Sequence, residues 1–421
     1  MTVLKALIDP GPPWFRRKSD SHEWDIWYAG HISDWCKIDK VLEDTSATDT
    51  NILEATISQQ YTCFALVCVA LEKCLAVVDH IRSYPIYYAV DGGTLLVGND
   101  ARKLLQNVGQ GTICNDGVGE YLLSGYVHNN RTLYQNIFQL NAGEYISSFP
   151  AERSYEINCY FRYLPPRIPY APARQTNKEN FSQFDFKLNK AFLRVIEAAR
   201  DRPVWIPLSG GLDSRLVLCK FLELGYKNIE TFSYGVAKNH EMKMAEAVAK
   251  QLGVRWRAIN SNLRDLKEIF ASETRKNYAR VADGLHMVPT YLDYEAIHFL
   301  VTQKLIPKDA VIINGYSGDF LFGGHIPEQL AIEPSVSLLI TKILEKHCSH
   351  ISSSRLATIR EDIFSTIKLE MEGLLAGDHS AESVCAGYEY WDWRERQTKA
   401  VVNGQRVYEY FGLDWLLPLW D

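Results

Sequence analysis

The chain has 421 residues, of which 47% are apolar and 23% are charged, and its formal net charge is −6. These values are ordinary for a soluble globular protein that buries sizeable cores, and the length favours two domains, with room for three. The basic residues do not cluster into tracts, which argues against a partner bound through a nucleic-acid backbone.

Cysteine usage and the first residues of the chain bear on where the protein works. The nine cysteines are an odd number and form no Cys-x-x-Cys pair, so neither a structural zinc site nor a disulfide framework is expected. Met1–Trp14 has no long apolar run after a basic start, so we expect no signal peptide. No run of about 18 apolar residues occurs, so we expect no membrane insertion. A reducing, cytoplasmic location fits this pattern.

The first part of the chain, to Tyr163, is predicted to be rich in β-strands. Four short apolar runs predict strands, and the turn sequence Asp91–Gly93 between the last two predicts a hairpin. The expected strands are Cys63–Ala70, Cys74–Val78, Ile86–Val90 and Leu95–Gly98, and a helix is expected at Asn115–Leu123.

A proline-rich stretch follows this part. Leu164–Arg174 contains four prolines, which cannot be accommodated inside a helix or a central strand. We therefore expect residues 164–176 to connect two domains, formed by residues 1–163 and residues 177–421.

The periodicity changes after the linker. Apolar side chains repeat at helical spacing from Phe181 to Val195, which predicts an amphipathic helix over Asn180–Ala199. Short apolar runs then alternate with helical segments, which indicates a parallel sheet with helices on both faces. The expected strands are Val204–Leu208, Ile229–Ser233, Trp256–Ile259 and Ala310–Asn314, and the expected helices are Leu212–Leu224 and Glu241–Leu252.

The segment Pro207–Ser214, with the sequence Pro-Leu-Ser-Gly-Gly-Leu-Asp-Ser, follows a predicted strand and opens a predicted helix. Small residues let the backbone wrap closely around a phosphate, toward which the first helical N–H groups point. Ser209 and Ser214 add hydroxyl donors. Asp213 would repel a bare phosphate, so its presence implies a bridging Mg²⁺. The alternative is a Gly-Gly turn whose Asp-Ser pair caps the helix.

This segment resembles the SGGxDS motif of the ATP-pyrophosphatase superfamily. Thr231–Gly235, at the end of the next strand, resembles the asparagine synthetase branch, in which that strand end frames the adenine. Ile313–Asp319, followed by Gly323-Gly324, resembles the segment that carries the second metal-binding aspartate of that branch, here Asp319. The alternative for this last segment is an Asx or glycine-rich turn at a sheet edge.

The N-terminal part resembles the same family. Val78–Tyr88 is similar to its D-x-x-R-x-x-P-L-Y-Y segment, which is mainly structural, and Gly98–Leu104 follows at the expected distance. The resemblance implies an α/β and α+β fold, with an N-terminal-nucleophile (Ntn) amidotransferase-like sandwich followed by a parallel-sheet ATP-pyrophosphatase domain. It is closest to the shorter asparagine-synthase-like proteins found with surface-polysaccharide genes. Gly-Tyr-x-x-Asp at Gly315–Asp319 is also similar to β-lactam synthetase.

The sequence departs from the family pattern in three places. The family's glutaminase needs Cys after the initiator Met, whereas this chain has Thr2 and also lacks the glutamine-holding R-G and N-G-E strings, so we expect a degenerate glutaminase. Tyr316 and Phe320 stand where asparagine synthetases have acids. The chain stops at Leu417–Asp421, which is similar to the family's R-x-P-F-L-D segment. Relatives continue beyond it to a basic active-site residue, so the chain is either a fragment or lacks part of the site.

The resemblance implies a two-step reaction that uses ATP and Mg²⁺. A substrate carboxylate attacks the α-phosphate, and an amine or ammonia then displaces AMP to form an amide. Asp213 and Asp319 would bind the metal, Leu208 and Ser233 would frame adenosine, and Gly211 between the two serines would cradle pyrophosphate. The full set of expected ATP-binding residues is Leu208, Ser209, Gly210, Gly211, Asp213, Ser214, Ser233 and Gly315.

Tyr316 is the expected catalytic group for the second step. A phenol can act as a general base if a nearby acid or base assists it, and Glu389 and Glu395 are candidates for that assistance. Glu395 is also well placed for a salt bridge with Lys399 on one helix face. The alternative is that Tyr316 only packs the strand end.

Two other functions stay open at this stage. The lost glutaminase residues and the short C-terminus fit a catalytically inactive relative that binds nucleotide or a partner, although the pairing of Asp213 with Asp319 opposes it. An ATP-pyrophosphatase acting on RNA or a base is disfavoured by the acidic balance. The expected partners are a small-molecule or glycan carboxylate and an amine or ammonia donor, without nucleic acid, and a homodimer is left open.

Overall fold

The computed structural model describes residues 3–43, 50–60, 63–71, 73–109, 111–148, 155–165, 178–237, 239–351 and 356–421. The chain divides into two compact units that are not consecutive stretches of sequence. Unit 1 comprises Met1–Pro172, Asp283–Val288 and Gly323–Val402, and unit 2 comprises Ala173–Ala282, Pro289–Phe322 and Asn403–Asp421. Thr2 and residues 166–176 of the expected linker lie outside the described residues.

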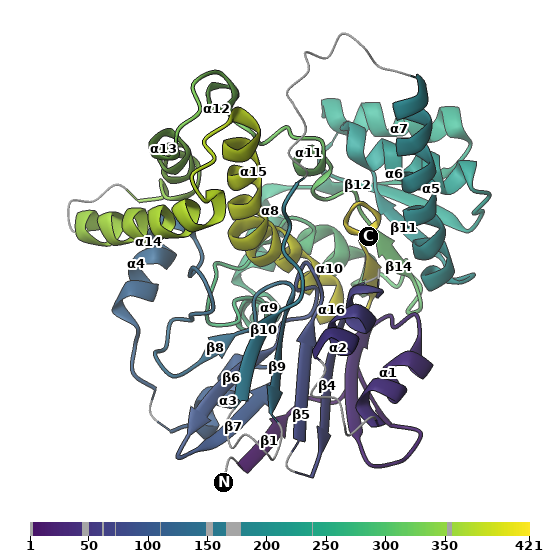
Figure 1. Cartoon of the computed structure of the whole chain (residues 1–421). Coiled ribbons are helices and arrows are strands. Elements are labelled where there is room, and N and C mark those ends of the chain that lie inside the picture. Colours follow the sequence, from purple (N-terminus) through teal and green to yellow (C-terminus); the bar gives the residue numbers. More distant parts are fainter. Residues whose placement is uncertain are drawn as a thin grey trace. The chain divides into compact units, whose positions relative to one another are not determined.

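Unit 1 contains two sheets (Figure 1). One has the strand order β1-β7-β6-β8, and the other has the order β10-β9-β5-β4-β3-β2 with antiparallel pairing throughout. Their strands are β1 (Val3–Leu7), β2 (Trp14–Lys18), β3 (Asp25–Gly30), β4 (Phe64–Ala70), β5 (Lys73–Val78), β6 (Tyr87–Asp91), β7 (Thr94–Gly98), β8 (Phe138–Gln139), β9 (Glu144–Ser148) and β10 (Tyr155–Cys159). The four strands expected from the sequence are therefore β4 to β7.

The predicted hairpin joins β6 and β7. Asp91 pairs with Thr94, and the two glycines between them have φ angles of 53° and 82°. A two-residue turn with both φ angles positive matches the right-handed twist of the strands, and glycine adopts it without a steric penalty.

The central strands of both sheets of unit 1 are buried on two faces. Helices α1 (Trp35–Glu43) and α2 (Thr50–Ser58) share an apolar core with one face of the six-stranded sheet, and α3 (Ala101–Asn107) shares one with the four-stranded sheet. The opposite faces are also buried, and the rings of Tyr88 on β6 and Tyr155 on β10 lie 6.2 Å apart. Unit 1 is thus an α+β sandwich, as expected.

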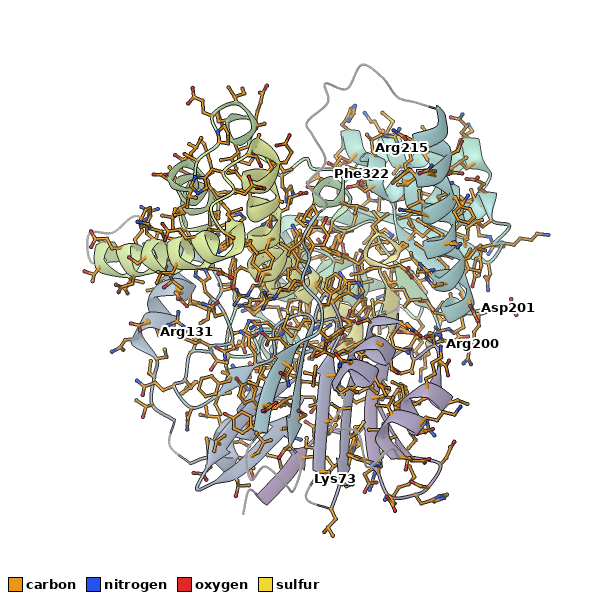
Figure 2. All side chains as sticks on the ribbon, in the orientation of Figure 1. Lys73, Arg131, Arg200, Asp201, Arg215 and Phe322 are labelled. Carbon is orange, nitrogen blue, oxygen red and sulfur yellow. The ribbon has the colours of Figure 1, made fainter. Side chains whose placement is uncertain are left out.

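The other described helices of unit 1 come from two separate parts of the sequence. They are α4 (Asn115–Ser124), which matches the predicted helix, and α12 (Glu328–Ile332), α13 (Val336–His347), α14 (Ala357–Leu375), α15 (Ala381–Trp391) and the π-helix η2 (Asp392–Val401). The loop after α4 is tied to that helix because Arg131 forms an ion pair with Glu120 (Figure 2).

Unit 2 is built on a parallel sheet with the order β13-β12-β11-β14-β15. The strands are β11 (Val204–Pro207), β12 (Ile229–Val236), β13 (Arg255–Ser261), β14 (Val311–Ile313) and β15 (Asp414–Leu416). The first four correspond to the predicted strands, and the alternation of strands with helices is confirmed. The sequence analysis did not anticipate β15, whose three residues are too few to show a period.

Helices cover this sheet. The predicted helices are α5 (Lys178–Ala199), α6 (Leu212–Glu223) and α7 (His240–Leu252), which form one core with Val204 and Ile206 of β11. Trp205 points to the other face and is also buried. The other helices are α8 (Leu263–Ala271), α9 (Glu273–Ala282), α10 (Tyr294–Thr302), α11 (Gly318–Leu321), α16 (Arg406–Tyr410), η4 (Pro418–Trp420) and η3 (Val402–Gln405), which begins at the boundary between the units. None of the described helices combines the length and apolar character needed to cross a membrane.

Candidate functional site

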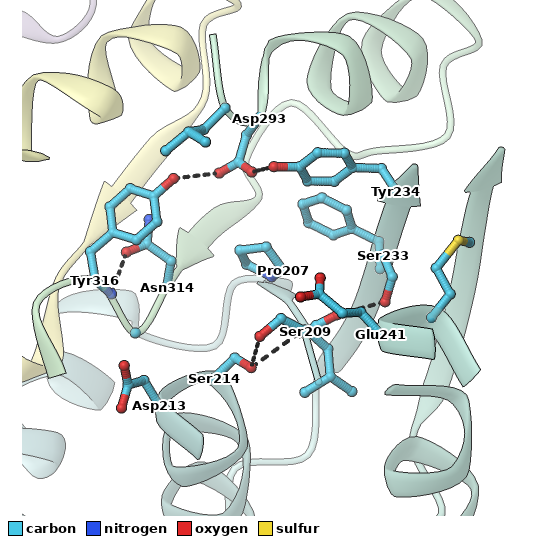
Figure 3. A pocket seen from close by; sticks show the side chains of 15 residues that line it. Pro207, Ser209, Asp213, Ser214, Ser233, Tyr234, Glu241, Asp293, Asn314 and Tyr316 are labelled. Atoms are coloured by element: carbon cyan, nitrogen blue, oxygen red, sulfur yellow. Dashed lines mark hydrogen bonds between the residues drawn. The ribbon is translucent and has the colours of Figure 1, made fainter. Parts of the chain in front are cut away.

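A cavity of about 310 Å³ lies in unit 2 where β11, β12 and β14 end (Figure 3). All three strands are parallel, so their carboxyl ends meet at one edge of the sheet. The next strand in sequence after β11 is its neighbour β12, whereas β14 lies on its other side. The connections therefore leave in opposite directions, and such a switch point is where α/β sheets bind ligands.

The loop between β11 and α6 is held in shape by its own hydrogen bonds. The backbone N–H of Ser209 donates to the hydroxyl of Ser214 (3.1 Å), and the N–H of Gly211 donates to the hydroxyl of Ser209 (3.0 Å). Arg215 on α6, visible in Figure 2, donates to the carbonyl of Gly210 (2.8 Å). The loop is thus preformed, and its small residues leave the backbone open to the cavity.

The N-terminus of α6 is the natural place for an anion. Gly211 is the N-cap residue, and no side chain among the described residues caps this helix end. The first N–H groups of a helix need acceptors, and the helix dipole makes its N-terminus positive. A phosphate group at this position would satisfy both requirements.

Ser233 and Leu208 lie on the side of the cavity formed by β12. The hydroxyl of Ser233 donates to the carbonyl of Leu208 (2.6 Å) and accepts from the indole N–H of Trp256 (2.8 Å). Both side chains are buried. The hydrogen bonds of the Ser233 hydroxyl therefore link the ends of β11 and β12 to β13. Ser233 shapes this wall of the cavity, and its hydroxyl is already used within the protein.

Asp213 lies in a narrow space made by two glycines. A Cβ atom on Gly318 would come within 2.4 Å of the Asp213 carboxyl carbon, and one on Gly315 would come within 2.7 Å of its backbone carbonyl carbon. The backbone N–H of Asp319 donates to the Asp213 carboxylate. Burial, and next the negative charge of Asp319, raise the pKa of Asp213. The two carboxylates thus lie close enough to repel each other.

A divalent cation fits this pair. Mg²⁺ prefers hard oxygen ligands in an octahedral arrangement and usually keeps water or phosphate oxygens besides one or two carboxylates. Among the described residues, no group of three or more His, Cys, Asp or Glu is placed to hold a metal ion. Asp213 and Asp319 would therefore leave room in the coordination sphere for other ligands, such as phosphate oxygens.

Another part of the cavity wall is organised around Asp293, which precedes α10. The hydroxyls of Tyr234 (2.6 Å), Tyr316 (3.2 Å) and Tyr408 all donate to its carboxylate (Figure 3 shows the first two). Asp293 is only 5% exposed. Three donors on one buried carboxylate satisfy it without a cation and fix the three rings relative to one another.

Tyr316 is a hydrogen-bond donor in this arrangement. Its own backbone N–H donates to the side chain of Asn314 (3.2 Å), which in turn donates to Gln405 (2.9 Å). Burial, and next the charge of Asp293, raise the pKa of Tyr316 well above its ordinary value, because both disfavour the phenolate. The geometry therefore favours a positioning role for this phenol over proton abstraction.

The two glutamates proposed to assist Tyr316 belong to unit 1. Glu395 is buried, accepts from Lys399 (2.7 Å) and from the backbone N–H of Asn129 (3.1 Å), and so forms the salt bridge that the sequence suggested. Burial would raise its pKa, but Lys399 and Arg394 lower the pKa of Glu395 to about 2. Glu389 lines a separate cavity of unit 1. The acid that contacts Tyr316 is Asp293, which the sequence analysis did not single out.

The structure brings most of the expected site residues to one cavity. Its lining includes Leu208, Ser209, Asp213, Ser214, Ser233, Gly315 and Tyr316. Gly210 and Gly211 form the loop beside it, and Asp319 is the exposed residue whose backbone contacts Asp213. Asp293 and Tyr234 also line the cavity. In the sequence, Asp293 stands before an amphipathic helix, and an aspartate at that position indicates only an N-cap. Its partners Tyr234 and Tyr316 are 59 and 23 residues away, so no local sequence pattern predicts that they meet.

Comparison with known proteins identifies one family domain in this chain. Residues 188–390 match the model of the family described as asparagine synthase. No curated protein matches the chain. Among solved structures, glutamine phosphoribosylpyrophosphate amidotransferase from B. subtilis, complexed with ADP and GMP, is 9% identical with a TM-score of 0.21, and the match covers 72% of this chain and 64% of that one.

A second solved structure, described as the allosteric regulatory enzyme of purine biosynthesis, is 10% identical with a TM-score of 0.22, over 83% of this chain and 73% of that one. Likenesses this weak support no argument about function. The family match, by contrast, spans the loop at Ser209, both aspartates and Tyr316. Residues 188–390, slightly less than half of the chain, therefore match an asparagine synthase domain.

Proposed function

We propose that the protein is an ATP-dependent ligase that joins a carboxylate to an amine or to ammonia, with release of AMP and pyrophosphate. The observation that carries this proposal is the pairing of Asp213 with Asp319 beside the uncapped N-terminus of α6. A positive helix end and two carboxylates that need a cation suit a polyphosphate with its Mg²⁺. The match of residues 188–390 to the asparagine synthase model supports this proposal, because it indicates a superfamily of ATP-dependent amidotransferases and ligases.

The residues of the cavity would divide the work as follows. Ser209, Gly211 and Ser214 hold the β- and γ-phosphates through backbone N–H and hydroxyl groups, while the wall at Leu208 and Ser233 contacts adenosine. Bound Mg²⁺ supplies charge neutralisation for the phosphates. The rest of the protein's contribution is to position the reactants. The substrate carboxylate is itself the nucleophile that attacks the α-phosphate, so no nucleophilic side chain is needed.

The chemistry balances in two steps. An oxygen of the substrate carboxylate forms a bond to the α-phosphorus as the bond to pyrophosphate breaks. The amine nitrogen then attacks the activated carbonyl carbon, AMP leaves, and the nitrogen gives up a proton. Tyr316, fixed by Asp293, lies at the cavity wall and orients the reactants for the second step. The carboxylate is a small molecule or a glycan acid.

The decisive experiment is exchange of labelled pyrophosphate into ATP, with Mg²⁺ present, across a panel of small-molecule and sugar carboxylates. We expect exchange that depends on one class of acid and on Mg²⁺, together with AMP rather than ADP when an amine is added. If MgATP binds but no acid in the panel supports exchange, the inactive relative becomes the better description. If ADP forms instead, the proposed reaction is wrong.

A further inference from the structure

A second cavity, in unit 1, has the properties of a binding site for an amine. Its volume is about 460 Å³, and it lies between α12 with the loop preceding it and one face of α15. Helices α12 and α15 pack against each other. We refer to it as the α12–α15 cavity. Its location in unit 1 makes it a different cavity from the one at Asp213.

The face of α15 that borders this cavity is unusual. Glu382, Cys385, Ala386 and Glu389 follow one another at i, i+3, i+4 and i+7 and therefore share one side of the helix. Such a stripe normally carries apolar residues that pack into a core. Two glutamates in it place carboxylates on the wall of an otherwise mostly apolar cavity.

Glu389 is the acidic residue of this cavity that is most relevant to ligand binding. It is 9% exposed and lines the cavity, yet it forms no hydrogen bond or ion pair with any described residue. The ring nitrogen Nδ1 of its neighbour His325 lies 2.7 Å from the carboxylate of Asp392. A buried carboxylate without a partner is costly, so a native structure that keeps one calls for an explanation.

Among the described residues that line the cavity, all the charged side chains are acidic. The lining includes three carboxylates, those of Glu328, Glu382 and Glu389, and no lysine, arginine or histidine among the described residues. The rest of the lining is apolar, as with Ile326 and Pro327. A ligand that completes this site must carry a positive charge at Glu389 and an apolar body along the remaining wall.

We propose that the α12–α15 cavity binds a primary alkylamine, whose ammonium group lies against the carboxylate of Glu389 and whose chain contacts the apolar wall. The ammonium donates hydrogen bonds to the carboxylate and replaces the missing partner. Binding here requires no nucleotide, so it stands or falls independently of the ATP-dependent reaction proposed above.

The first test is calorimetric titration of the whole chain with n-hexylamine, in the absence of nucleotide. 1-Hexanol and hexanoate are the comparison probes, since they keep a six-carbon skeleton and replace the ammonium with a neutral or a negatively charged head group. We expect hexylamine to bind at least tenfold more tightly than either. Each methylene from butylamine to hexylamine should add up to about fourfold in affinity. Equal binding of hexanol and hexylamine, or no binding of hexylamine, overturns the proposal.

Variants assign the binding to this cavity. Glu389→Gln keeps the shape and removes the charge, and it should weaken hexylamine at least tenfold. Glu361→Gln, on the exposed face of α14, is the control and should stay within twofold of the parent. Ala331→Leu should also weaken binding, because it fills the cavity from α12. Unchanged affinity in both Glu389→Gln and Ala331→Leu contradicts the assignment.

The pH dependence gives a further readout. Burial, and next the charge of Asp392, raise the pKa of Glu389 to about 7, and only the deprotonated form attracts an ammonium. The titratable groups near it are Asp392, His325, Cys385, Glu382 and Tyr163. Hexylamine affinity should rise roughly tenfold between pH 6 and pH 8, and Glu389→Gln should abolish this rise. A rise that persists in the variant comes from another group and counts against the proposal.

Discussion

Asp213 is tightly constrained in the site, so we expect substitutions there to be poorly tolerated. Its carboxylate fits against two glycines, and burial together with Asp319 raises its pKa. Two carboxylates at one place repel each other unless a cation lies between them. A substitution that removes one charge therefore removes the reason for a divalent ion to bind there.

Asp213→Asn is the direct test of this arrangement. We expect it to lower Mg²⁺-dependent ATP turnover by more than about 100-fold, because losing a direct ligand should exceed the ~10–100-fold cost of losing an outer partner. Asp201→Asn, on the exposed loop before β11, is the matched control and should leave turnover unchanged. Binding of MgATP to Asp213→Asn and Asp319→Asn as to the parent would show that the metal is held elsewhere.

Tyr316 separates the two steps of the proposed reaction. Tyr316→Phe removes the hydroxyl that donates to Asp293 and leaves that carboxylate two other tyrosine donors. If the phenol orients the second reactant, pyrophosphate exchange should remain near that of the parent while amide formation slows. Equal loss of both activities would indicate a role in packing or nucleotide binding. No loss of either would remove Tyr316 from the mechanism.

At the level of elements, two helical glycines with different surroundings test whether the space beside Asp213 is needed for MgATP binding. Gly318, at the start of α11, has Asp213 where a Cβ would lie, whereas Gly373, within α14, has no atom within 4 Å of that position. We expect Gly318→Ala to displace Asp213 and abolish MgATP binding. Gly373→Ala should instead raise the free energy of unfolding by about 0.5–1 kcal/mol, because alanine is the better helix former. Calorimetry and urea denaturation measure the two effects.

The π-helix η2 is fastened to an N-terminal loop of unit 1 by Lys399. The fully buried ammonium donates to the carbonyls of Val127 (3.2 Å) and Asn129 (2.5 Å) and to Glu395 (2.7 Å). Removing it leaves Glu395 charged and buried with one fewer counter-charge. We therefore expect η2 to be stable when Lys399 and Glu395 are both present or both replaced, and to be destabilised when only one of them is removed.

Lys399→Met should lower the free energy of unfolding by about 3–5 kcal/mol in urea denaturation. The double variant Lys399→Met/Glu395→Gln should recover part of that loss, since no buried charge then lacks its partner. Arg264→Met breaks a pair with the same spacing on the exposed surface of α8 and should cost less than about 1 kcal/mol. A Lys399→Met effect as small as the Arg264→Met effect would show that the buried pair contributes little.

At the scale of the whole molecule, nucleotide binding should appear as stability. A ligand that binds only the folded state adds about 2.7 kcal/mol to the free energy of unfolding when it is present at 100 times its dissociation constant. With MgATP, we expect hydrogen exchange to slow at Leu208–Ser214 and Gly315–Asp319. ATP with excess chelator is the control. Slowed exchange without any effect of the chelator would contradict a metal bridge at Asp213.

The sequence by itself determined the local parts of the molecule. Helical and strand periods predicted β4 to β7, α4 to α7 and four strands of the parallel sheet, because each of these signals lies within one element. The string Pro207–Ser214 predicted a phosphate loop, since the residues that shape it are consecutive. The pairing of Asp213 with Asp319 was expected from the resemblance of Ile313–Asp319 to the asparagine synthetase branch.

Only the tertiary structure decided which distant groups meet. Asp293 gathers three tyrosines that lie 59, 23 and 115 residues away, and Lys399 contacts carbonyls 272 and 270 residues away. Residues 323–402 likewise join unit 1 rather than the stretch of sequence on either side of them. Burial of charge is settled by how elements pack, and no period or spacing in a single sequence records it. Glu389, which has no hydrogen-bond partner among the described residues, could therefore be recognised only after the helix face around it was known.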